Sequence, residues 1–426
     1  MSPASIPEPG QFDRRKPTLD AFSRHRYDPR HVRVLIVSPY PVTPPLHGGR
    51  VRVLGIASGL ARAGAEVAVL CPWVPWNRLR TQPEPGLECF SHLFCANLLP
   101  ALAPWLAPPL VLLSFQPHRG GLRRRLARFR EFDVFQFEFC AHTRAMDLAP
   151  PGAKVVYSAH NVEADFLSAE GDRYLLKHAS RSRIEQLERF AIERSDLILA
   201  CSAADGARLH ELYGAPRRLA VIPNGFDAAW LSFRGEETRA EARAALDLAP
   251  GDRAIVFVGG DAHHNREAVD FLVRAVLPRL PEDARLLVAG RSARLGEHSH
   301  PRFRRMGFVA DLRPLFAAAD VAVNPVAFGS GSNVKLAEYL AAGLPVLTTP
   351  FGLRGFPQAG HPALRVVERD DFVGALRGPL PQAARDGASL SDVTWDAIGR
   401  RVYALYDELC RGGRRAQPTL SPATAG

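Results

Sequence analysis

Apolar runs alternate with amphipathic stretches along the chain from residue 31 onward. The first unit reads HVRVLIVSPYP over 31–41, which is typical of a buried strand, followed by a loop, a helix that ends near Gly64 and a second strand over 66–71. We expect further strands at 133–139, 154–158, 196–201 and 219–222, with a helix over 174–193 between two of them. Strands that alternate with helices in this way predict a doubly wound α/β sheet with right-handed crossovers.

The second half of the chain repeats the alternation. Its strands are expected at 254–259, 284–290, 306–309 and 320–326, and its helices at 266–280 and 311–319. Pro223, Asn224 and Gly225 are turn-forming residues and predict a hinge between the halves. The organisation that we predict is a disordered tail at 1–30, Rossmann-like domains at 31–225 and 226–390, a helix at 391–411 that packs back on the first domain, and a disordered tail at 412–426.

The most informative stretch is FGSGSNVKLAEYLAAGLPVLTT at 328–349, where a loop of glycines and serines opens directly into a short helix. Small residues leave backbone N–H groups uncovered, and the start of the helix adds its positive end, so the stretch predicts a cradle for phosphate and sugar. Ser332 or Asn333 can cap the helix, Gly343 can end it, and 344–349 is expected to be a buried parallel strand.

Two charged residues of this helix carry candidate chemistry. Lys335 and Glu338 are three positions apart and therefore share one helical face. In a binding role, the lysine would contact phosphate and the glutamate would accept hydrogen bonds from sugar hydroxyls. The alternative is an ion contact between the two side chains on the helix surface, and spacing alone does not decide between these two interpretations.

Two further candidate segments follow predicted strands, at the carboxyl edge where open α/β sheets bind ligands. Gly48 and Gly49 lie between the first strand and its helix, where they could bind an anion or form a tight turn. His160, Asn161 and Glu163 follow a strand near the middle of the chain. The last two could instead cap a helix, and the histidine could be a buried structural residue.

Composition and charge restrict the setting. The chain has 426 residues, too many for one ordinary core, and its formal charge of +10 suits anionic partners. Arginine carries most of the positive charge, which a genomic base bias would explain equally well, and Lys335 is one of only four lysines. The six cysteines have no metal-ligand spacing, and the first 30 residues lack the apolar core of a secretory signal. We therefore expect a protein of the reducing cytoplasm.

A possible membrane contact lies between the strands expected at 66–71 and 133–139. The apolar run at 98–115 approaches the length of a membrane span, but its four prolines argue against a continuous helix, so no span is expected. The basic stretch 119–130 that follows has apolar residues at helical spacing, Leu122, Leu126 and Phe129. It predicts an amphipathic helix that either attaches to a membrane surface or simply covers the sheet. It lacks an aromatic stacking platform, so nucleic acid is not an expected partner.

Several of these motifs together resemble one enzyme family. These motifs are HNVE after a strand, VIPNG at the junction, GFVADLRPLFAAADVAVNP, and GSGSNVKLAEYLAAGLPVLTT followed by GLRG. Together they are similar to motifs of the retaining glycosyltransferases of group 1, also called family 4. The resemblance extends over about 32–407. It implies the α/β GT-B fold, in which two Rossmann-like, doubly wound domains face each other across a cleft. The N-terminal domain would hold the acceptor, and the C-terminal domain would hold a nucleotide-sugar donor.

The resemblance also assigns roles to single positions. Glu338 matches the second glutamate of the family's E-x7-E signature, which binds the nucleotide ribose, whereas Ser330 stands in place of the first glutamate. His160 resembles the histidine near the transferred sugar, and Gly48 with Gly49 resembles the loop that approaches the phosphates.

The chain departs from the family pattern where the diphosphate is usually held. Gly260 and Asn265 stand where many members have an arginine and a lysine that clamp the pyrophosphate. Lys335 is then the remaining cation for the diphosphate, with Arg291 or Arg266 as helpers.

The resulting hypothesis is a glycosyltransferase that moves a sugar from a UDP- or GDP-sugar to a glycan, lipid-linked or small-molecule acceptor with retention of configuration, in polysaccharide biosynthesis at the inner face of a membrane. The expected catalytic residues are His160, Lys335 and Glu338. The expected donor-binding residues are Gly48, Gly49, Arg291, Ser330, Gly331, Ser332 and Asn333. The family implies no metal, no D-x-D motif stands where one would be expected, and no cofactor is foreseen. The alternatives are a degenerate sugar-nucleotide-binding protein and another GT-B enzyme, such as an epimerase or a phosphorylase.

Overall fold

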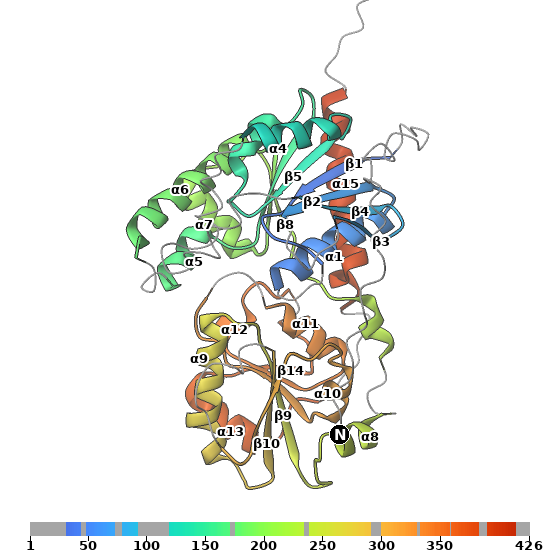
Figure 1. The fold of residues 1–426 in the computed structure, drawn as a ribbon. Helices are drawn as coiled ribbons and strands as arrows, with labels where there is room; N and C mark the ends of the chain where they lie inside the picture. Colours follow the sequence, from blue (N-terminus) through green and yellow to red (C-terminus); the bar gives the residue numbers. More distant parts are fainter. Residues whose placement is uncertain are drawn as a thin grey trace, which may run out of the picture. The chain divides into compact units, whose positions relative to one another are not determined.

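The computed structural model contains two α/β domains, each built around its own sheet (Figure 1). It describes residues 31–43, 48–72, 79–92, 119–170, 175–233, 238–290, 300–329, 333–357, 359–382 and 390–414. The predicted fold class is confirmed, because both sheets are doubly wound and have helices in the connections between their parallel strands. The tail predicted at 1–30 lies outside the described residues.

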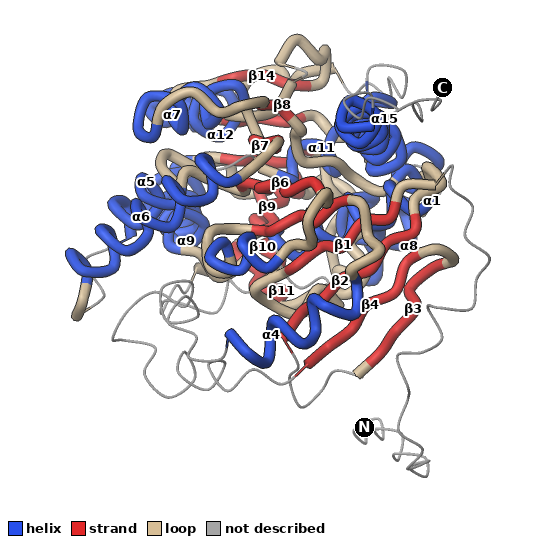
Figure 2. The backbone as a smooth tube through the Cα atoms, turned by 90° about the horizontal axis from the view of Figure 1, so that it is seen from above, coloured by secondary structure: helices blue, strands red, loops and turns tan. Residues whose placement is uncertain are grey.

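The N-terminal sheet has eight strands in the order β3-β4-β2-β1-β5-β6-β7-β8 (Figure 2). The strands are β1 Arg33–Val37, β2 Glu66–Pro72, β3 Arg80–Glu84, β4 Leu87–His92, β5 Val134–Glu138, β6 Lys154–Ala159, β7 Leu197–Ala200 and β8 Leu219–Val221. All neighbours are parallel except β3, which is antiparallel to β4. β1 and β5 pair from Val34 opposite Val134 to Val37 opposite Phe137.

Apolar runs form the central strands because both faces of this sheet are covered. Every residue of β5 is buried, and β1 is buried except for its first residue. The β3–β4 hairpin was not predicted from the sequence. β3 reads RTQPE, has no buried residue and contains Pro83, which is compatible only with an edge strand.

Helices of the N-terminal domain cover both faces of its sheet (Figure 1). They are α1 Gly48–Arg62, α4 Arg119–Leu126, α5 Glu163–Glu170, α6 Lys177–Arg194 and α7 Ala203–Tyr213, with short 3₁₀ turns at Ala127–Phe129 and Thr143–Leu148. The helix expected at 174–193 is α6. Serine at its N-cap fixes the start of α7, because the Ser202 side chain accepts a hydrogen bond from the Asp205 amide.

The last helix, α15 Trp395–Arg414, packs beside α1 although the two come from opposite ends of the chain (Figure 1). Glycines permit this close approach: a Cβ on Gly399 would lie 2.1 Å from the carbonyl carbon of Gly59. Trp395 and Tyr406 add side chains of α15 to the N-terminal core. The helix begins at Trp395 and continues to Arg414, so it starts and ends a few residues later than the expected 391–411.

The C-terminal sheet has six parallel strands in the order β11-β10-β9-β12-β13-β14. They are β9 Arg253–Val258, β10 Ala284–Ala289, β11 Phe303–Gly307, β12 Val321–Asn324, β13 Val346–Thr348 and β14 Leu364–Val366. β11 begins earlier than the strand expected at 306–309. It ends at Gly307, whose φ of +66° is a left-handed conformation that favours glycine.

The α-helices described in the C-terminal domain are short, none longer than the nine residues of α9. They are α8 Arg239–Ala245, α9 His263–Phe271, α10 Arg313–Ala318, α11 Val334–Ala341, α12 Pro350–Leu353 and α13 Phe372–Arg377, with 3₁₀ turns at Ala228–Ser232, Arg369–Asp371 and Ser391–Val393. The prediction of a single helix over 266–280 is wrong in its later part. After α9 the chain forms a π-helical turn, Leu272–Val276, and a 3₁₀ turn, Leu277–Arg279, because Pro278 cannot continue an α-helix.

Strand order locates the ligand-binding edge of each sheet. The chain runs from β1 outward to β2 on one side and later enters β5 on the other side of β1. The same reversal occurs between β9 and β12 in the second sheet. Open α/β sheets bind ligands at the carboxyl ends of the strands where the order reverses. A ligand site is therefore expected in the loops that follow β1, β5, β9 and β12.

Within the described ranges, the chain has no helix that is both long and apolar enough to span a bilayer. The apolar run at 98–115 lies outside those ranges.

Candidate functional site

The predicted cradle lies after β12, at the point where the strand order of the second sheet reverses. Its helix, α11, buries Leu336, Tyr339 and Leu340, and the Tyr339 hydroxyl accepts a hydrogen bond of 2.8 Å from the amide of Val258 at the end of β9. These contacts fix α11 against the sheet. Lys335 lies four residues before Tyr339 and therefore on the same side of the helix, next to Phe257 of β9.

The start and the end of α11 differ in how well the sequence predicted them. Asn333 occupies the N-cap, but its side chain does not cap the helix and instead donates a 2.9 Å hydrogen bond to the carbonyl of Gly352. Gly343 follows the end of the helix with φ +80°, as expected for a glycine terminator. Ser330, Gly331 and Ser332 lie outside the described residues.

Lys335 is half-buried and points toward the loop that follows β9. Its ammonium donates a 2.8 Å hydrogen bond to the Asn265 side chain and lies 4.3 Å from the ring centroid of Phe257. Asn265 in turn donates to the carbonyl of Gly260 at 3.2 Å. Burial lowers the pKa of Lys335 to about 7. The side chain forms no ion pair with Glu338, so the alternative of a simple surface ion contact is not what the structure contains.

Lys335 lies beside the positions at which the sequence departs from the pattern of the family that it resembles. Gly260 and Asn265 replace the expected cations, and the single ammonium of Lys335 reaches Asn265 from α11. Arg266 pairs with Asp261 at 3.2 Å, which partly neutralises it, and Arg291 lies outside the described residues. Lys335 is therefore the cation at this edge that has no carboxylate partner in the described part of the chain.

Glu338 lies one turn further along α11 and is half-buried. Burial raises the pKa of its carboxyl to about 7, and the nearby Lys335 partly offsets the rise. Its side chain makes no hydrogen bond to another described residue. When the carboxyl is ionised, both of its oxygens are available as acceptors for hydroxyl groups.

Two histidines at the start of α9 also border the cradle, and sequence reasoning missed them. The His263 ring lies 5.1 Å from the ring of Phe328, and His264 packs against Gly329. Gly329 has φ +126°, and a Cβ there would lie 3.1 Å from the His264 Nδ1. Burial, followed by the charge of Lys335, lowers the pKa of His264 to about 4. The loops after β9 and β12 thus meet, and the adjacent pair of histidines after a strand was the only signal.

At the N-terminal edge, His160 follows β6 and is buried, with 5% of its surface exposed. Its Nε2 lies 2.5 Å from Oε2 of Glu138, the last residue of β5, and its ring stacks on Phe139 with centroids 3.8 Å apart. Burial lowers the pKa of His160, and the hydrogen bond to Glu138 partly offsets this effect. The sequence did not indicate Glu138, because it lies inside an apolar strand.

Gly48 and Gly49 are the first residues of α1, so their amides have no partner within the helix. One turn later, Arg52 is 1% exposed and donates to the Pro223 carbonyl at 3.2 Å and to the Asn224 side chain at 3.0 Å. Arg52 thereby holds the predicted hinge segment. No sequence pattern pointed to it.

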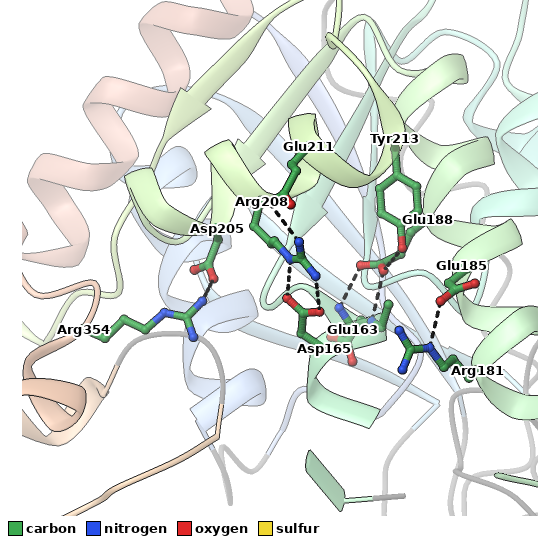
Figure 3. Close-up of polar contacts among 11 residues, drawn as sticks. Glu163, Asp165, Arg181, Glu185, Glu188, Asp205, Arg208, Glu211, Tyr213 and Arg354 are labelled. Carbon is green, nitrogen blue, oxygen red and sulfur yellow. Dashed lines mark hydrogen bonds and ion pairs between the residues drawn. The ribbon is translucent and has the colours of Figure 1, made fainter. Parts of the chain in front are cut away.

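The helix-cap interpretation of Asn161 and Glu163 needs correction. Asn161 donates to the Glu163 side chain at 3.0 Å, but the cap of α5 comes from Glu188 of α6. The Glu188 carboxylate accepts hydrogen bonds from the amides of Glu163 and Ala164, at 2.8 and 3.1 Å, and from the Tyr213 hydroxyl at 2.8 Å (Figure 3). Burial raises the pKa of Glu163 to about 8 and that of Glu188 to about 7.

The basic stretch at 119–130 forms α4 and the 3₁₀ turn after it. Its apolar residues Leu122, Leu126 and Phe129 are buried in the domain. Arg124 and Arg128 are exposed, and burial together with these two guanidinium groups lowers the pKa of Arg125. The helix is amphipathic as predicted, but its apolar face is used within the protein.

Comparison with known proteins assigns the family. The model of the glycosyl transferases group 1 matches residues 252–378, and that of glycosyltransferase family 4 matches residues 46–230. D-inositol 3-phosphate glycosyltransferase of Nocardia farcinica is 30% identical over 55% of each chain, so this match spans about half of that relative. The enzyme of the same name from Rhodococcus erythropolis is 28% identical over 85% of this chain and 86% of its own.

Solved structures agree on the fold. The α,α-trehalose 6-phosphate synthase of Burkholderia multivorans has a TM-score of 0.63 at 13% identity, covering 92% of this chain and 99% of that one. HepE of Anabaena, in complex with UDP-glucose, has a TM-score of 0.55 at 16% identity, covering 90% and 98%. Matches to both halves of the chain and the two doubly wound sheets lead to one conclusion: the chain belongs to the group 1, family 4 glycosyltransferases of the GT-B fold.

Proposed function

We propose that this glycosyltransferase takes its sugar from a nucleotide-diphosphate donor and transfers it with retention of configuration. The observation that carries the donor class is Lys335, whose ammonium is held on Asn265 beside a glycine loop and near the start of α11. A cation without a carboxylate partner and a helix N-terminus both favour a phosphate. The complex of HepE with UDP-glucose supports a UDP-sugar, with a GDP-sugar as the second choice.

In this proposal, different residues of the cradle bind different parts of the donor. Lys335 and the amides at the start of α11 bind the diphosphate, and Glu338 accepts hydrogen bonds from the ribose hydroxyls. Arg291, Ser330, Gly331, Ser332 and Asn333 are proposed to complete the donor site. At the other edge, Gly48 and Gly49 offer the free amides of α1 to the phosphates.

Catalysis would then depend on the leaving group. As the bond from the sugar to the diphosphate breaks, negative charge develops on the phosphate oxygen and positive charge on the sugar. The ammonium of Lys335 stabilises the first of these charges, and positioning of the acceptor supplies much of the rest. No protein nucleophile is proposed. His160 contacts the transferred sugar.

The acceptor is proposed to be a glycan, a lipid-linked sugar or a small molecule, used in polysaccharide synthesis at the inner face of a membrane. The arginines of α4 support a membrane surface with acidic lipids. Because Leu122, Leu126 and Phe129 are buried, the contact would be electrostatic and would not insert apolar side chains.

A screen of nucleotide sugars tests the donor class. Wild type, Lys335→Ala and Glu338→Ala would be incubated with UDP-, GDP- and ADP-sugars, with thermal stabilisation and slow donor hydrolysis as readouts. Loss of one charge-assisted hydrogen bond should weaken the response about 10-fold or more. Lys154→Ala is the matched control, because Lys154 is the first residue of β6 and lies at the amino edge, away from the ligands.

The outcomes separate the two main interpretations. A donor that stabilises and is hydrolysed by wild type and by Lys154→Ala, but not by the two cradle variants, supports the proposal and identifies the base. If no nucleotide sugar binds, the proposal fails. If a nucleotide sugar binds but is neither hydrolysed nor transferred, the degenerate binding protein suggested by Ser330 is the better account. Retention would be read from the anomeric configuration of the product.

A further inference from the structure

A chain of buried polar side chains connects the C-terminal helix with His160. The Tyr406 hydroxyl of α15 donates a 2.5 Å hydrogen bond to the side-chain oxygen of Gln136. The Gln136 amide nitrogen donates to Oε1 of Glu138, and Oε2 of Glu138 lies 2.5 Å from Nε2 of His160. Tyr406, Gln136 and Glu138 are fully buried, and His160 is 5% exposed. A polar chain this deep is costly unless each member is bonded, so its geometry is constrained.

The direction of the hydrogen bonds determines which nitrogen of His160 carries a proton. The Gln136 oxygen is occupied by Tyr406, so its amide nitrogen faces Glu138 and can only donate. A carboxylate at Glu138 then accepts on both oxygens, once from Gln136 and once from His160. Nε2 of His160 must therefore carry the hydrogen. The partner of one ring nitrogen sets the tautomer, and hence the state of the other nitrogen.

The surroundings favour a neutral ring. Burial lowers the pKa of His160, and the charge of Arg52 on α1 lowers it further, against the opposing effect of Glu138. A neutral imidazole has one N–H, and here that N–H faces Glu138. Nδ1 then carries a lone pair, and it has no hydrogen-bond partner among the described residues.

The ring is also held in its plane. It stacks on Phe139 at an angle of 32°, and Tyr40 packs edge-on against the same phenylalanine at 5.4 Å. Phe139 has φ +58°, a left-handed conformation that is rare for an aromatic residue and that only a well-packed surrounding maintains. The loops after β1, β5 and β6 therefore fix the orientation of His160 jointly, at the edge where the strand order reverses.

We propose that Glu138 is a positioning residue that holds His160 in the Nε2–H tautomer, so that Nδ1 accepts a hydrogen bond from a hydroxyl group of the sugar substrate. This inference rests on the proposed function for the identity of the substrate. It assigns the chemistry of the contact, an sp² nitrogen acceptor for a hydroxyl donor, and excludes a protonated histidine as a phosphate ligand. Gln136 and Tyr406 connect Glu138 to α15 by hydrogen bonds, so α15 also helps to hold the Glu138 side chain in place.

Histidine NMR and kinetics test the proposal together. In protein labelled with ¹⁵N-histidine, long-range ¹H–¹⁵N spectra distinguish the two tautomers of a neutral ring. Wild type should show His160 with its proton on Nε2, and Glu138→Gln should show a mixture or the other tautomer. Its kcat for donor turnover should fall about 10-fold, the effect of losing one ordinary substrate hydrogen bond, while KM for the donor changes much less.

Two further variants separate positioning from general damage. Tyr213→Phe removes a buried hydroxyl that bonds to Glu188 and does not contact His160, and it should leave the His160 spectrum and kcat unchanged. In a His160→Ala background, Glu138→Gln should have little further effect on kcat, because Glu138 acts through the histidine. Glu138→Asp should restore part of the wild-type tautomer population.

Several results would overturn the inference. A wild-type ring with its proton on Nδ1, or a tautomer that Glu138→Gln does not alter, would show that Glu138 does not set it. An equal fall in kcat with and without His160 would show that Glu138 acts only on the fold. A changed tautomer with unchanged kcat would show that Nδ1 of His160 does not contact the substrate. If no nucleotide sugar is turned over at all, the proposed function fails, and the spectra still decide whether Glu138 sets the tautomer.

Discussion

The two sheets share a topology, but their ligand-binding edges are built in opposite ways. At the N-terminal edge, His160 and Glu138 bond to each other and, through Gln136, to Tyr406, all of them buried. At the C-terminal edge, Lys335 has one neutral amide partner and the Glu338 side chain has none among the described residues. In this buried chain, Nδ1 of His160 is left as an acceptor for a ligand, while the other polar groups bond to one another. The C-terminal edge keeps bonding capacity for a charged ligand.

Under the proposed function, this difference assigns a separate task to each edge. A pre-organised hydrogen-bonded network holds a neutral acceptor atom in place, which suits orientation of an uncharged sugar. A half-buried ammonium beside a glycine loop gains a strong partner only when an anion arrives, which suits tight binding of a diphosphate. If the two edges are independent, a substitution at one edge should leave ligand binding at the other unchanged.

Substitution of Gly399 by alanine should have the largest effect and should be confined to the N-terminal edge. An added Cβ would lie 2.1 Å from the backbone of Gly59, so α15 must move away from α1. Forced displacement in a packed core costs about 1–3 kcal/mol in the free energy of unfolding, and here we expect the upper part of that range. Urea unfolding of Gly399→Ala measures the loss.

The matched control lies in the same helix. Gly412→Ala adds a Cβ that meets no atom within 4 Å, so the variant should be neutral or more stable by about 0.5–1 kcal/mol, because alanine favours helix. Donor binding by Gly399→Ala at low temperature should stay close to that of wild type. A large loss of donor affinity in the folded variant would mean that the two edges are not independent.

The buried carboxylates of α5 and α6 predict a pH dependence of stability. The folded-state pKa values of Glu163, about 8, and Glu188, about 7, lie above the usual value of 4.5. The folded state therefore binds more protons than the unfolded state between about pH 5 and 8, and stability falls as the pH rises through this window. Glu163→Gln, which cannot ionise, should reduce the fall by about 1–2 kcal/mol in urea titrations at pH 5.5, 7 and 8.5.

An exposed carboxylate on α6, the helix that carries Glu188, provides the control. Glu185 pairs with Arg181 at 2.9 Å and is 43% exposed (Figure 3), so Glu185→Gln should leave the pH dependence as in wild type. Wild-type stability that rises between pH 5.5 and 8 would contradict the assignment of protonated buried carboxyls.

The smallest expected effect is electrostatic binding of α4 to membranes. Vesicles with acidic lipids should bind the protein at low salt and release it as salt increases, because the apolar face of the helix is buried in the domain. Each exposed arginine contributes about 1 kcal/mol near such a surface, so Arg124→Ala with Arg128→Ala should reduce binding about 10-fold or more. Binding to neutral vesicles, or binding that resists high salt, would show that apolar insertion occurs after all.

The sequence was most informative where a feature is contiguous. Apolar runs gave most strands to within a few residues, because both faces of each sheet are covered. The cradle at 328–349 was recognisable because its loop, helix and terminator follow one another, with Gly343 ending the helix as predicted. The β3–β4 hairpin escaped notice because β3 is polar and lies at an edge.

What the sequence did not reveal depends on pairs that are distant in the chain. Glu138 and His160 are 22 residues apart, and Gln136 and Tyr406 are 270 apart. The cap of α5 by Glu188 and the contact of Lys335 with Asn265 are of the same kind. A glutamine or a glutamate within an apolar strand carries no local sign of its partner, so only the folded arrangement identifies it.

The most direct test of the central claim is a calorimetric titration with UDP and UMP, repeated with GDP and GMP, on wild type, Lys335→Ala and Lys335→Arg. The account places Lys335 on the diphosphate, so wild type should bind its preferred nucleoside diphosphate about 10-fold or more tightly than the monophosphate. Lys335→Ala should lose that preference, and Lys335→Arg should retain part of it. An unchanged preference in Lys335→Ala, or no nucleotide binding by wild type, would contradict the account.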